Sequence, residues 1–293
     1  MSTPATVRTK PHHATNEWAA ATHVYEPHVV GLPPVRQYLR EVWRRREFAV
    51  ELSRTNLRAQ HFDSVFGQLW LVLNPLMLAG VYFVLIDIVR RGSHPPGFFA
   101  HLTAGIFAYY FVSNSVRDGV KSVVSGGRLI LNSAFPRMLL PLSSVITAFK
   151  RFVPTAIVYI PIHMLSGLPV SPALVWVVPL TFLFALLAAG FAMLAAAVQV
   201  YFRDLKNFLP YALRVALYAS PVLYLASEVP ERYQFLLDIN PLARLLEAWS
   251  SVLYLGEAPP VQAVVVGTAW AVGAFVVGAA FFMSREREFA VRL

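Results

Sequence analysis

Long apolar runs alternate with short polar segments along this chain, and the pattern predicts helices that cross a membrane. A helix needs about 20 consecutive apolar residues to span the hydrocarbon core of a bilayer. Six segments reach that length, and no strand alternation of the outer-membrane barrel kind competes with them. The expected spans are residues 69–89, 98–116, 139–167, 173–201, 208–226 and 261–283.

The Lys and Arg residues between these spans set the expected orientation. With the N-terminus inside, eighteen of them fall in inside segments, and only Arg90, Arg91, Arg232 and Arg244 fall outside. Cytoplasmic loops are enriched in Lys and Arg, so we place both termini in the cytosol. The result is an all-α integral membrane protein with a six-span transmembrane domain over residues 67–293.

Two segments precede the first span. Residues 1–34 are polar and lack the apolar core of a signal peptide, which predicts a disordered cytosolic tail. Residues 35–66 mix arginines with apolar side chains, which predicts an amphipathic interface helix on the inner membrane surface. The alternative is a solvated helix that would leave Trp43 and Phe48 exposed.

Between the last two spans, residues 227–260 hold apolar stretches too short to cross, and we expect short helices there on the outer face.

Composition agrees with a membrane protein and excludes several kinds of chemistry. Of 293 residues, 57% are hydrophobic and 14% are charged, and the net charge of +9 suits contact with anionic lipid. Cysteine is absent, which excludes disulfides and thiol catalysis. The spans contain one carboxylate, Asp87, whose spacing to Arg90 and Arg91 predicts a local ion pair.

No catalytic or metal site can be assigned from the residues. The pair Arg203–Asp204 is interpreted as a structural salt bridge, and no paired carboxylates or metal-ligand spacings occur. Ion-coupled transporters usually carry buried acidic groups in their spans, and the sequence lacks a P-loop for ATP. Another subunit must therefore drive this protein, or it is a passive pore.

Five short motifs in order resemble one family. They are FGQLWLVLNPL (66–76), LILNSAFPRMLLP (129–141), YFRDLKNFLPY (201–211), SPVLY (220–224) and INPLARLLEAW (239–249). Together they resemble the membrane subunit of type-2 ABC exporters for polysaccharides, the Wzm-like permeases of O-antigen, teichoic acid and galactan export. The resemblance covers residue 35 to the C-terminus. The motif residues are Gly67, Trp70, Pro75, Phe135, Pro136, Arg137, Arg203, Asp204, Ser220, Pro221, Asn240 and Pro241.

The resemblance implies partners and a substrate. Such a permease is a homodimer in the bacterial cytoplasmic membrane, bound to two copies of an ATPase subunit that holds ATP and Mg, and this chain binds no cofactor itself. The cargo is a glycan linked to a polyprenyl pyrophosphate, and the short outer helices act as gates. A docking helix for the ATPase would fall within residues 117–133, where Gly126 and Gly127 either weaken its middle or mark its end. Its candidate contacts are Arg117, Asp118, Lys121 and Arg128. The alternatives are a type-2 permease for a lipid or drug, or a polyprenyl-linked glycosyltransferase, which would need an acidic pair.

Three cations inside the spans are candidates for the substrate path: Lys150, Arg151 and Arg214. If the third span begins near 147, the first two reach the cytosolic interface. If it begins near 139, they lie about 17 Å along the helix, at 1.5 Å per residue, where no span offers a carboxylate. They would then attract an anionic head group. Aromatic side chains could stack on sugars or form an interfacial belt: Tyr109, Tyr110, Phe111, Tyr218 and Tyr224.

Overall fold

The computed structural model describes residues 34–61 and 67–292. The expected tail, residues 1–34, lies outside the described residues except for its last position. The described elements belong to one compact unit, Leu32–Leu293, and all their regular secondary structure is helical. The all-α expectation is therefore confirmed for these residues.

Twelve α-helices and several single turns make up the described chain. The α-helices are α1 (Val35–Arg44), α2 (Arg46–His61), α3 (Trp70–Val89), α4 (Phe98–Ser125), α5 (Gly127–Asn132), α6 (Leu139–Leu165), α7 (Val177–Tyr201), α8 (Leu205–Tyr218), α9 (Phe235–Ile239), α10 (Ala243–Ser250), α11 (Val261–Arg285) and α12 (Phe289–Arg292). The turns are η2 (Gly67–Leu69), η3 (Pro172–Trp176), η4 (Ala226–Glu228), η5 (Glu231–Tyr233), η6 (Ser251–Leu255) and η7 (Glu286–Glu288).

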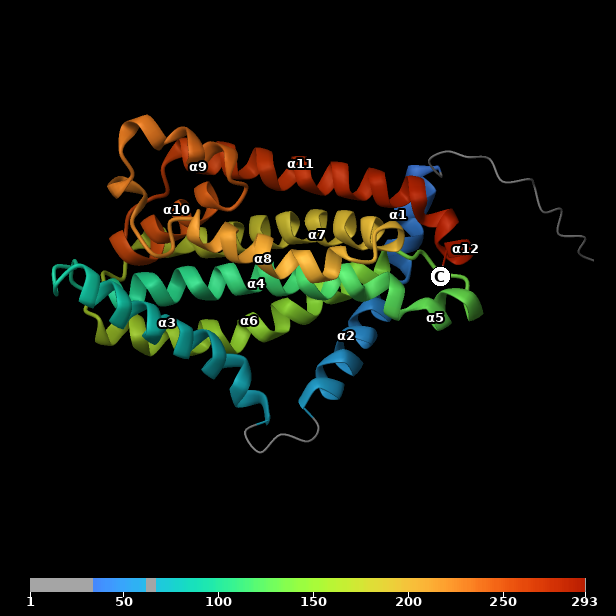
Figure 1. Cartoon of the computed structure of the whole chain (residues 1–293), viewed down its shortest axis with the longest axis horizontal. Coiled ribbons are helices and arrows are strands. Elements are labelled where there is room, and N and C mark those ends of the chain that lie inside the picture. Colours follow the sequence, from blue (N-terminus) through green and yellow to red (C-terminus); the bar gives the residue numbers. More distant parts are fainter. Residues whose placement is uncertain (1–33, 62–66, 293) are drawn as a thin grey trace, which may run out of the picture. The chain divides into compact units, whose positions relative to one another are not determined.

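Helix α4 lies at the centre of the unit. It packs along α6 and α7, and α3, α8 and α10 also contact it (Figure 1). Most residues of α4 are buried, whereas in α3 only Pro75 and Ala79 are buried. Helix α11 lies on the other side of α7. Helix α4 is therefore the element that most of the other long helices share as a neighbour.

Small residues bring the helices together. Helix α11 places Ala263, Gly267, Ala271 and Gly278 on its buried side, and α7 buries a run of alanines around Gly190. Spacings of three and four residues put such positions on one helix face. Without a hydrophobic force between helices in lipid, close backbone approach through small residues is a main source of packing energy. This explains why α7 and α11 form the most extensive helix pair.

The two ends of the bundle differ (Figure 1). We call one the α5 end, where α1, α2, α5 and α12 gather, and the other the α10 end, where α9, α10 and the turns between α8 and α11 gather. At the α5 end, the Arg45 side chain donates a hydrogen bond to the carbonyl of Ala134 at 2.5 Å. At the α10 end, Arg90 forms a two-pronged ion pair with Glu228, with N–O distances of 2.7 and 2.6 Å. Each end is thus tied by contacts between segments far apart in sequence.

Four stretches of the described helices are long and apolar enough to cross a membrane: Trp70–Val89, Leu139–Leu165, Pro172–Tyr201 and Val261–Arg292. They coincide with the first, third, fourth and sixth expected spans. The second and fifth expected spans differ from the structure. Helix α4 continues past residue 116 to Ser125.

The expected span over residues 208–226 is wrong as one continuous helix. Helix α8 has 14 residues and ends at Tyr218. At 1.5 Å per residue it is about 21 Å long, shorter than the roughly 30 Å hydrocarbon core. Ser220 precedes Pro221, and proline disfavours the helical conformation in the residue before it, so the chain turns there.

Two further expectations change in detail. The interface segment is two helices, α1 and α2, which meet at Arg45 instead of forming one rod. Phe48 is partly buried, with its ring 5.0 Å from that of Phe135, whereas Trp43 is 70% exposed. Helix α6 begins at Leu139, which selects the longer of the two registers considered for the third span.

Candidate functional site

A cavity of about 580 Å³ lies between α3, α4 and α6, and we call it the main cavity because charged side chains line it. Two hollows with almost wholly apolar linings are larger, at about 650 and 620 Å³. Five positions of α4 reach it, and their spacing of three and four residues places them on one helix face. They are Phe107, Tyr110, Phe111, Asn114 and Arg117. The facing residues of α6 are Ala148, Arg151, Phe152 and Thr155, and α3 contributes Trp70, Leu71, Asn74, Pro75, Met77, Leu78 and Val81.

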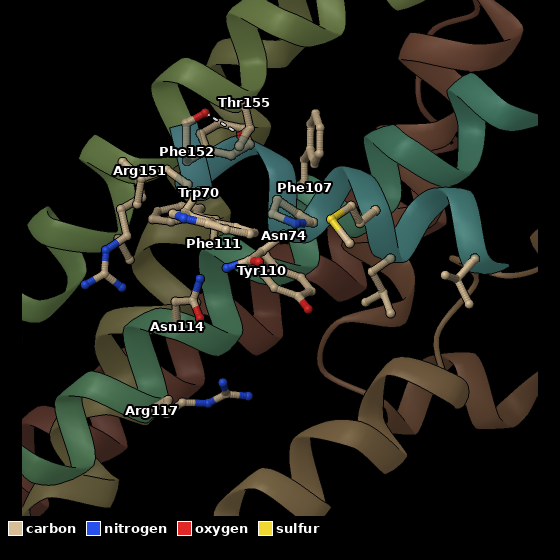
Figure 2. Close-up of a pocket in the computed structure, with 16 residues that line it drawn as sticks. Trp70, Asn74, Phe107, Tyr110, Phe111, Asn114, Arg117, Arg151, Phe152 and Thr155 are labelled. Carbon is tan, nitrogen blue, oxygen red and sulfur yellow. Dashed lines mark hydrogen bonds between the residues drawn. The ribbon is translucent and has the colours of Figure 1, made fainter. Parts of the chain in front are cut away.

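The lining combines aromatic rings with a few polar groups. Figure 2 shows Arg117 at one end of the cavity and Thr155 at the other, with Trp70, Asn74 and Tyr110 between them. The rings of Phe111 and Phe152 stack with their centroids 5.4 Å apart. Among the described lining residues, the only charges are the two arginines. The main cavity therefore has positive charge at Arg117 with flat apolar surfaces beside it, whereas the charge of Arg151 is balanced by a carboxylate outside the lining.

Arg151 has a carboxylate partner that the sequence analysis missed. Its Nη1 lies 2.9 Å from Oδ2 of Asp118 on α4, and its side chain is 14% exposed. The expectation that no span offers a carboxylate at this depth is wrong. Helix α4 continues beyond residue 116, so Asp118 lies within this helix and reaches Arg151 on α6. The pair lies about 10 Å from the end of α4 and about 18 Å from the start of α6, at 1.5 Å per residue.

The structure separates Lys150 from Arg151. Lys150 Nζ donates to the carbonyl of Val50 on α2 at 3.3 Å, at the α5 end, and it does not line the main cavity. Adjacent helix positions point about 100° apart, so one cation can face the cavity while its neighbour reaches outward. Arg214 is exposed on α8 and likewise lies outside the cavity lining.

Only two of the five candidate aromatic residues line the main cavity, Tyr110 and Phe111. Tyr109 is buried and donates its hydroxyl to the carbonyl of Leu213, which ties α4 to α8. Tyr218 is exposed, and its hydroxyl lies 3.2 Å from that of Tyr82. Tyr224 lies beyond α8, toward the α10 end.

A second cavity of about 420 Å³ lies at the α5 end, between α2, α4, α5 and α6, and we call it the small cavity. Three of the four candidate docking residues line it: Asp118, Lys121 and Arg128. The fourth, Arg117, lines the main cavity instead. Helix α4 ends at Ser125 and α5 begins at Gly127, so the glycine pair marks the end of a helix and not the middle of one.

The motif FPR is held at the α5 end. The backbone N–H of Arg137 donates to Oε1 of Glu286 at 2.6 Å, and its side chain donates to the Glu286 carbonyl. Tyr38 donates its hydroxyl to the other Glu286 oxygen. Burial, followed by the nearby Glu286 charge, raises the pKa of Tyr38 far above its ordinary value, so the phenol remains a donor. Pro136, between the motif's two other residues, is buried.

The motif residues Arg203 and Asp204 lie in the turn between α7 and α8. Arg203 donates to the carbonyl of Arg292 at 3.1 Å, and Asp204 precedes α8. The expected Arg203–Asp204 salt bridge is not among the ion pairs of the described residues, nor is a pair between Asp87 and Arg90 or Arg91. Asp87 instead lies 3.1 Å from His94.

At the α10 end, two motifs that are far apart in sequence meet. The Asn240 side chain donates to the Ala219 carbonyl and to the Ser220 hydroxyl, both at 3.0 Å. Pro221 and Pro241 follow these two motif residues directly. Gly67, at the opposite side of the first span, adopts a positive φ of 46° in η2.

The sequence analysis missed three lining residues that are polar but uncharged, Asn74, Asn114 and Thr155. Amides are infrequent in apolar spans, because an unsatisfied polar group in hydrocarbon costs several kcal/mol. Asn74 and Asn114 are therefore a usable signal in the sequence, and each belongs to a helix that also carries a cavity aromatic residue.

Comparisons with known proteins indicate the family of this chain. Residues 47–254 match the family described as ABC-2 type transporter. An O-antigen export system permease protein RfbA from Klebsiella pneumoniae is 26% identical over 211 residues, covering 72% of this chain and 81% of the relative. A protein of the same name from Myxococcus xanthus is 27% identical over 258 residues, covering 86% of this chain and 97% of the relative.

Proposed function

The chain belongs to the ABC-2 type transporter family and is a multi-pass membrane subunit of a transporter. We propose that it exports a polysaccharide linked to polyprenyl pyrophosphate across the bacterial cytoplasmic membrane. The printed names of the relatives support an O-antigen-like glycan as cargo. A separate ATPase subunit supplies the energy, since the sequence has no P-loop of its own.

The proposed assembly is a homodimer with two ATPase copies and both termini in the cytosol. Each copy crosses the membrane six times, with α4 as the second span and α8 completed by the turn at residues 219–225 as the fifth. The 28 residues of α4 are about 42 Å long at 1.5 Å per residue, enough to cross. Helix α1 lies on the inner surface, supported by the exposed Trp43, and α9 and α10 act as outer gate helices.

The observation that carries this proposal is the positive charge of Arg117 in the main cavity. A cation at the bilayer centre costs about 2.5–3.5 kcal/mol on insertion scales, so arginines persist there only when they are paired or face an aqueous path. Arg117 is exposed and lines the cavity, as do Tyr110 and Phe111 on the same helix. A pyrophosphate would bind the guanidinium groups, and sugars would stack on the aromatic faces.

Two cations on neighbouring helices, Arg117 on α4 and Lys150 on α6, offer a matched test of this site. The assembled transporter would be reconstituted with its ATPase and assayed for transport of its lipid-linked glycan. We expect Arg117→Gln to reduce transport about tenfold, the loss of roughly 1.4 kcal/mol of head-group binding. Lys150→Gln, which alters a cation of similar depth that points at α2, should transport normally. Equal transport by both variants would show that the main cavity is not part of the substrate path.

The energy source and cargo can be tested separately. The purified chain alone should not hydrolyse ATP, and activity should appear when the ATPase subunit is added. Comparable hydrolysis by the chain alone would end the permease assignment. Stimulation by a lipid or drug without glycan, in place of the lipid-linked glycan, would instead favour another type-2 permease.

A further inference from the structure

Two side-chain amides line the main cavity without a hydrogen-bond partner in the part of the chain that the structure describes. They belong to Asn74 on α3 and Asn114 on α4. An amide offers two donors and an acceptor oxygen with two lone pairs. Leaving such a group unsatisfied is costly in an apolar setting, so these amides need water or a polar ligand in the cavity.

A backbone acceptor belongs to the same lining. Pro75 lies inside α3 and has no N–H, so the carbonyl of Leu71, four residues earlier, lacks its usual helical donor. Both residues line the main cavity, which thus offers donors and acceptors together. A phosphate oxygen only accepts hydrogen bonds, whereas a sugar hydroxyl both donates and accepts them. The lining therefore suits a neutral polyhydroxyl group beside the anion, and not a second anion.

Helix α4 places three kinds of side chain in sequence along one face. Arg117, Asn114 and Tyr110 line the cavity about 4.5 and 6 Å apart along the helix axis, at 1.5 Å per residue. In Figure 2, Asn114 lies between Arg117 and the aromatic rings. Trp70, one turn before Asn74, adds an exposed ring from α3. A cation, an amide and aromatic rings therefore follow one another through the cavity.

We propose that Asn74 and Asn114 bind the sugar that is attached directly to the pyrophosphate. The pyrophosphate lies at Arg117, the amides hydrogen-bond the hydroxyl groups of this first sugar, and the apolar face of the sugar ring packs on an aromatic side chain. The inference rests on the proposed function and deepens it, because the cavity then recognises the junction that polymers of every length share. A site built to hydrogen-bond hydroxyl groups discriminates against ligands that lack them.

Short synthetic lipids measure the contribution of the sugar. The reference probe is the methyl ester of farnesyl pyrophosphate, and the sugar probes carry glucose, galactose or N-acetylglucosamine in place of the methyl group, with the same charge. Affinities would be measured on the complex with its ATPase in nanodiscs. We expect the wild type to bind at least one sugar probe about tenfold more tightly than the methyl ester, the effect of two hydrogen bonds. Equal binding of all four probes would overturn the sugar site.

Four variants locate this preference. Asn74→Leu and Asn114→Leu nearly keep side-chain size but remove the hydrogen-bonding groups, and each should reduce the preference for the sugar probe about three- to fivefold while the methyl ester binds as before. Gln262→Leu removes an exposed amide near the start of α11 and should keep the preference. Arg117→Gln should weaken both probes by the same factor, because both carry the pyrophosphate.

The outcomes separate the sugar site from the proposed function. Amide variants that keep the wild-type preference, or that weaken both probes equally, would refute the sugar site while binding of the methyl ester leaves the head-group site intact. If the wild type binds no probe, the anionic cargo fails as well. Loss of self-association with an unchanged preference would show that the amides pair between copies of the chain.

A smaller substitution decides the matter if the leucine variants do not assemble. Asn74→Ser and Asn114→Ser keep a polar group but shorten its reach, so the preference for the sugar probe should fall and the affinity for the methyl ester should not. An unchanged preference in both serine variants would overturn the proposal.

Discussion

Replacing Gly278 with alanine should disrupt the packing of α11 on α7. An added Cβ at this position would lie 2.2 Å from the backbone oxygen of Gly190 and 2.9 Å from its carbonyl carbon. The atoms in the way belong to the backbone, which cannot rotate aside as a side chain can. The helices would therefore have to separate locally.

The size of the effect follows from the contact distance. An ordinary contact for a Cβ begins at 3.4 Å, so the interface must open from 2.2 Å by about 1.2 Å. A gap of 0.5–1 Å already loses a quarter to a half of the dispersion energy of each atom pair across it. Overpacking typically costs about 1–3 kcal/mol, and contact with backbone atoms places Gly278→Ala at the upper end of that range.

Gly273 provides a matched control on the same helix. An added Cβ there meets nothing within 4 Å. Since alanine is a better helix former than glycine, Gly273→Ala should be neutral or slightly stabilising. Unfolding of the purified protein in mixed micelles would be followed by tryptophan fluorescence as SDS is added. Equal stability of the two variants would refute the close approach of α7 and α11.

Three further predictions concern other parts of the molecule. Charge reversal at Lys121 together with Arg128 should reduce the yield of complex with the ATPase in a pull-down, because like charges across an interface repel; normal yield would place the contact elsewhere. The Arg90 guanidinium holds the pKa of Glu228 below its ordinary value of about 4.5, so the pair stabilises the protein above that pH and loses this contribution as the pH falls further. Wild-type thermal stability should therefore drop more steeply below pH 4.5 than that of Glu228→Gln, and parallel curves would contradict the ion pair. Arg214→Gln, on the exposed face of α8, should lower glycan transport only if α8 faces the path, so unchanged transport would confine the cationic path to the main cavity.

Periodicity and composition determined the helical class and the approximate position of five helices. The expected segments at residues 69–89, 139–167 and 261–283 lie within a few residues of α3, α6 and α11. Hydrophobic length predicts such helices well, because every backbone polar group in lipid must be bonded within its own segment. The family could also be recognised from the sequence, because several short motifs in a fixed order are specific to a family even where overall sequence similarity is low.

The helix ends that shape the site could not be predicted from hydropathy. The expected second span stopped at residue 116 because the next positions are Arg117 and Asp118. In the structure α4 continues through them, since Asp118 pairs with Arg151 and Gly119 packs closely on Ala192. An ion pair formed in the tertiary structure offsets the free-energy cost of placing a charged side chain in an apolar environment. Hydropathy averaged over a stretch of sequence contains no information about such partners.

The sequence by itself therefore determined the approximate position of the long apolar helices and which cations are unusual. Only the tertiary structure decided that Arg151 faces a cavity with a carboxylate beside it while Lys150 reaches α2. The physical reason is that helix rotation is set by packing against neighbours. Adjacent side chains point about 100° apart, so a modest rotation of α6 exchanges which cation faces α4, and that rotation depends on contacts between distant segments.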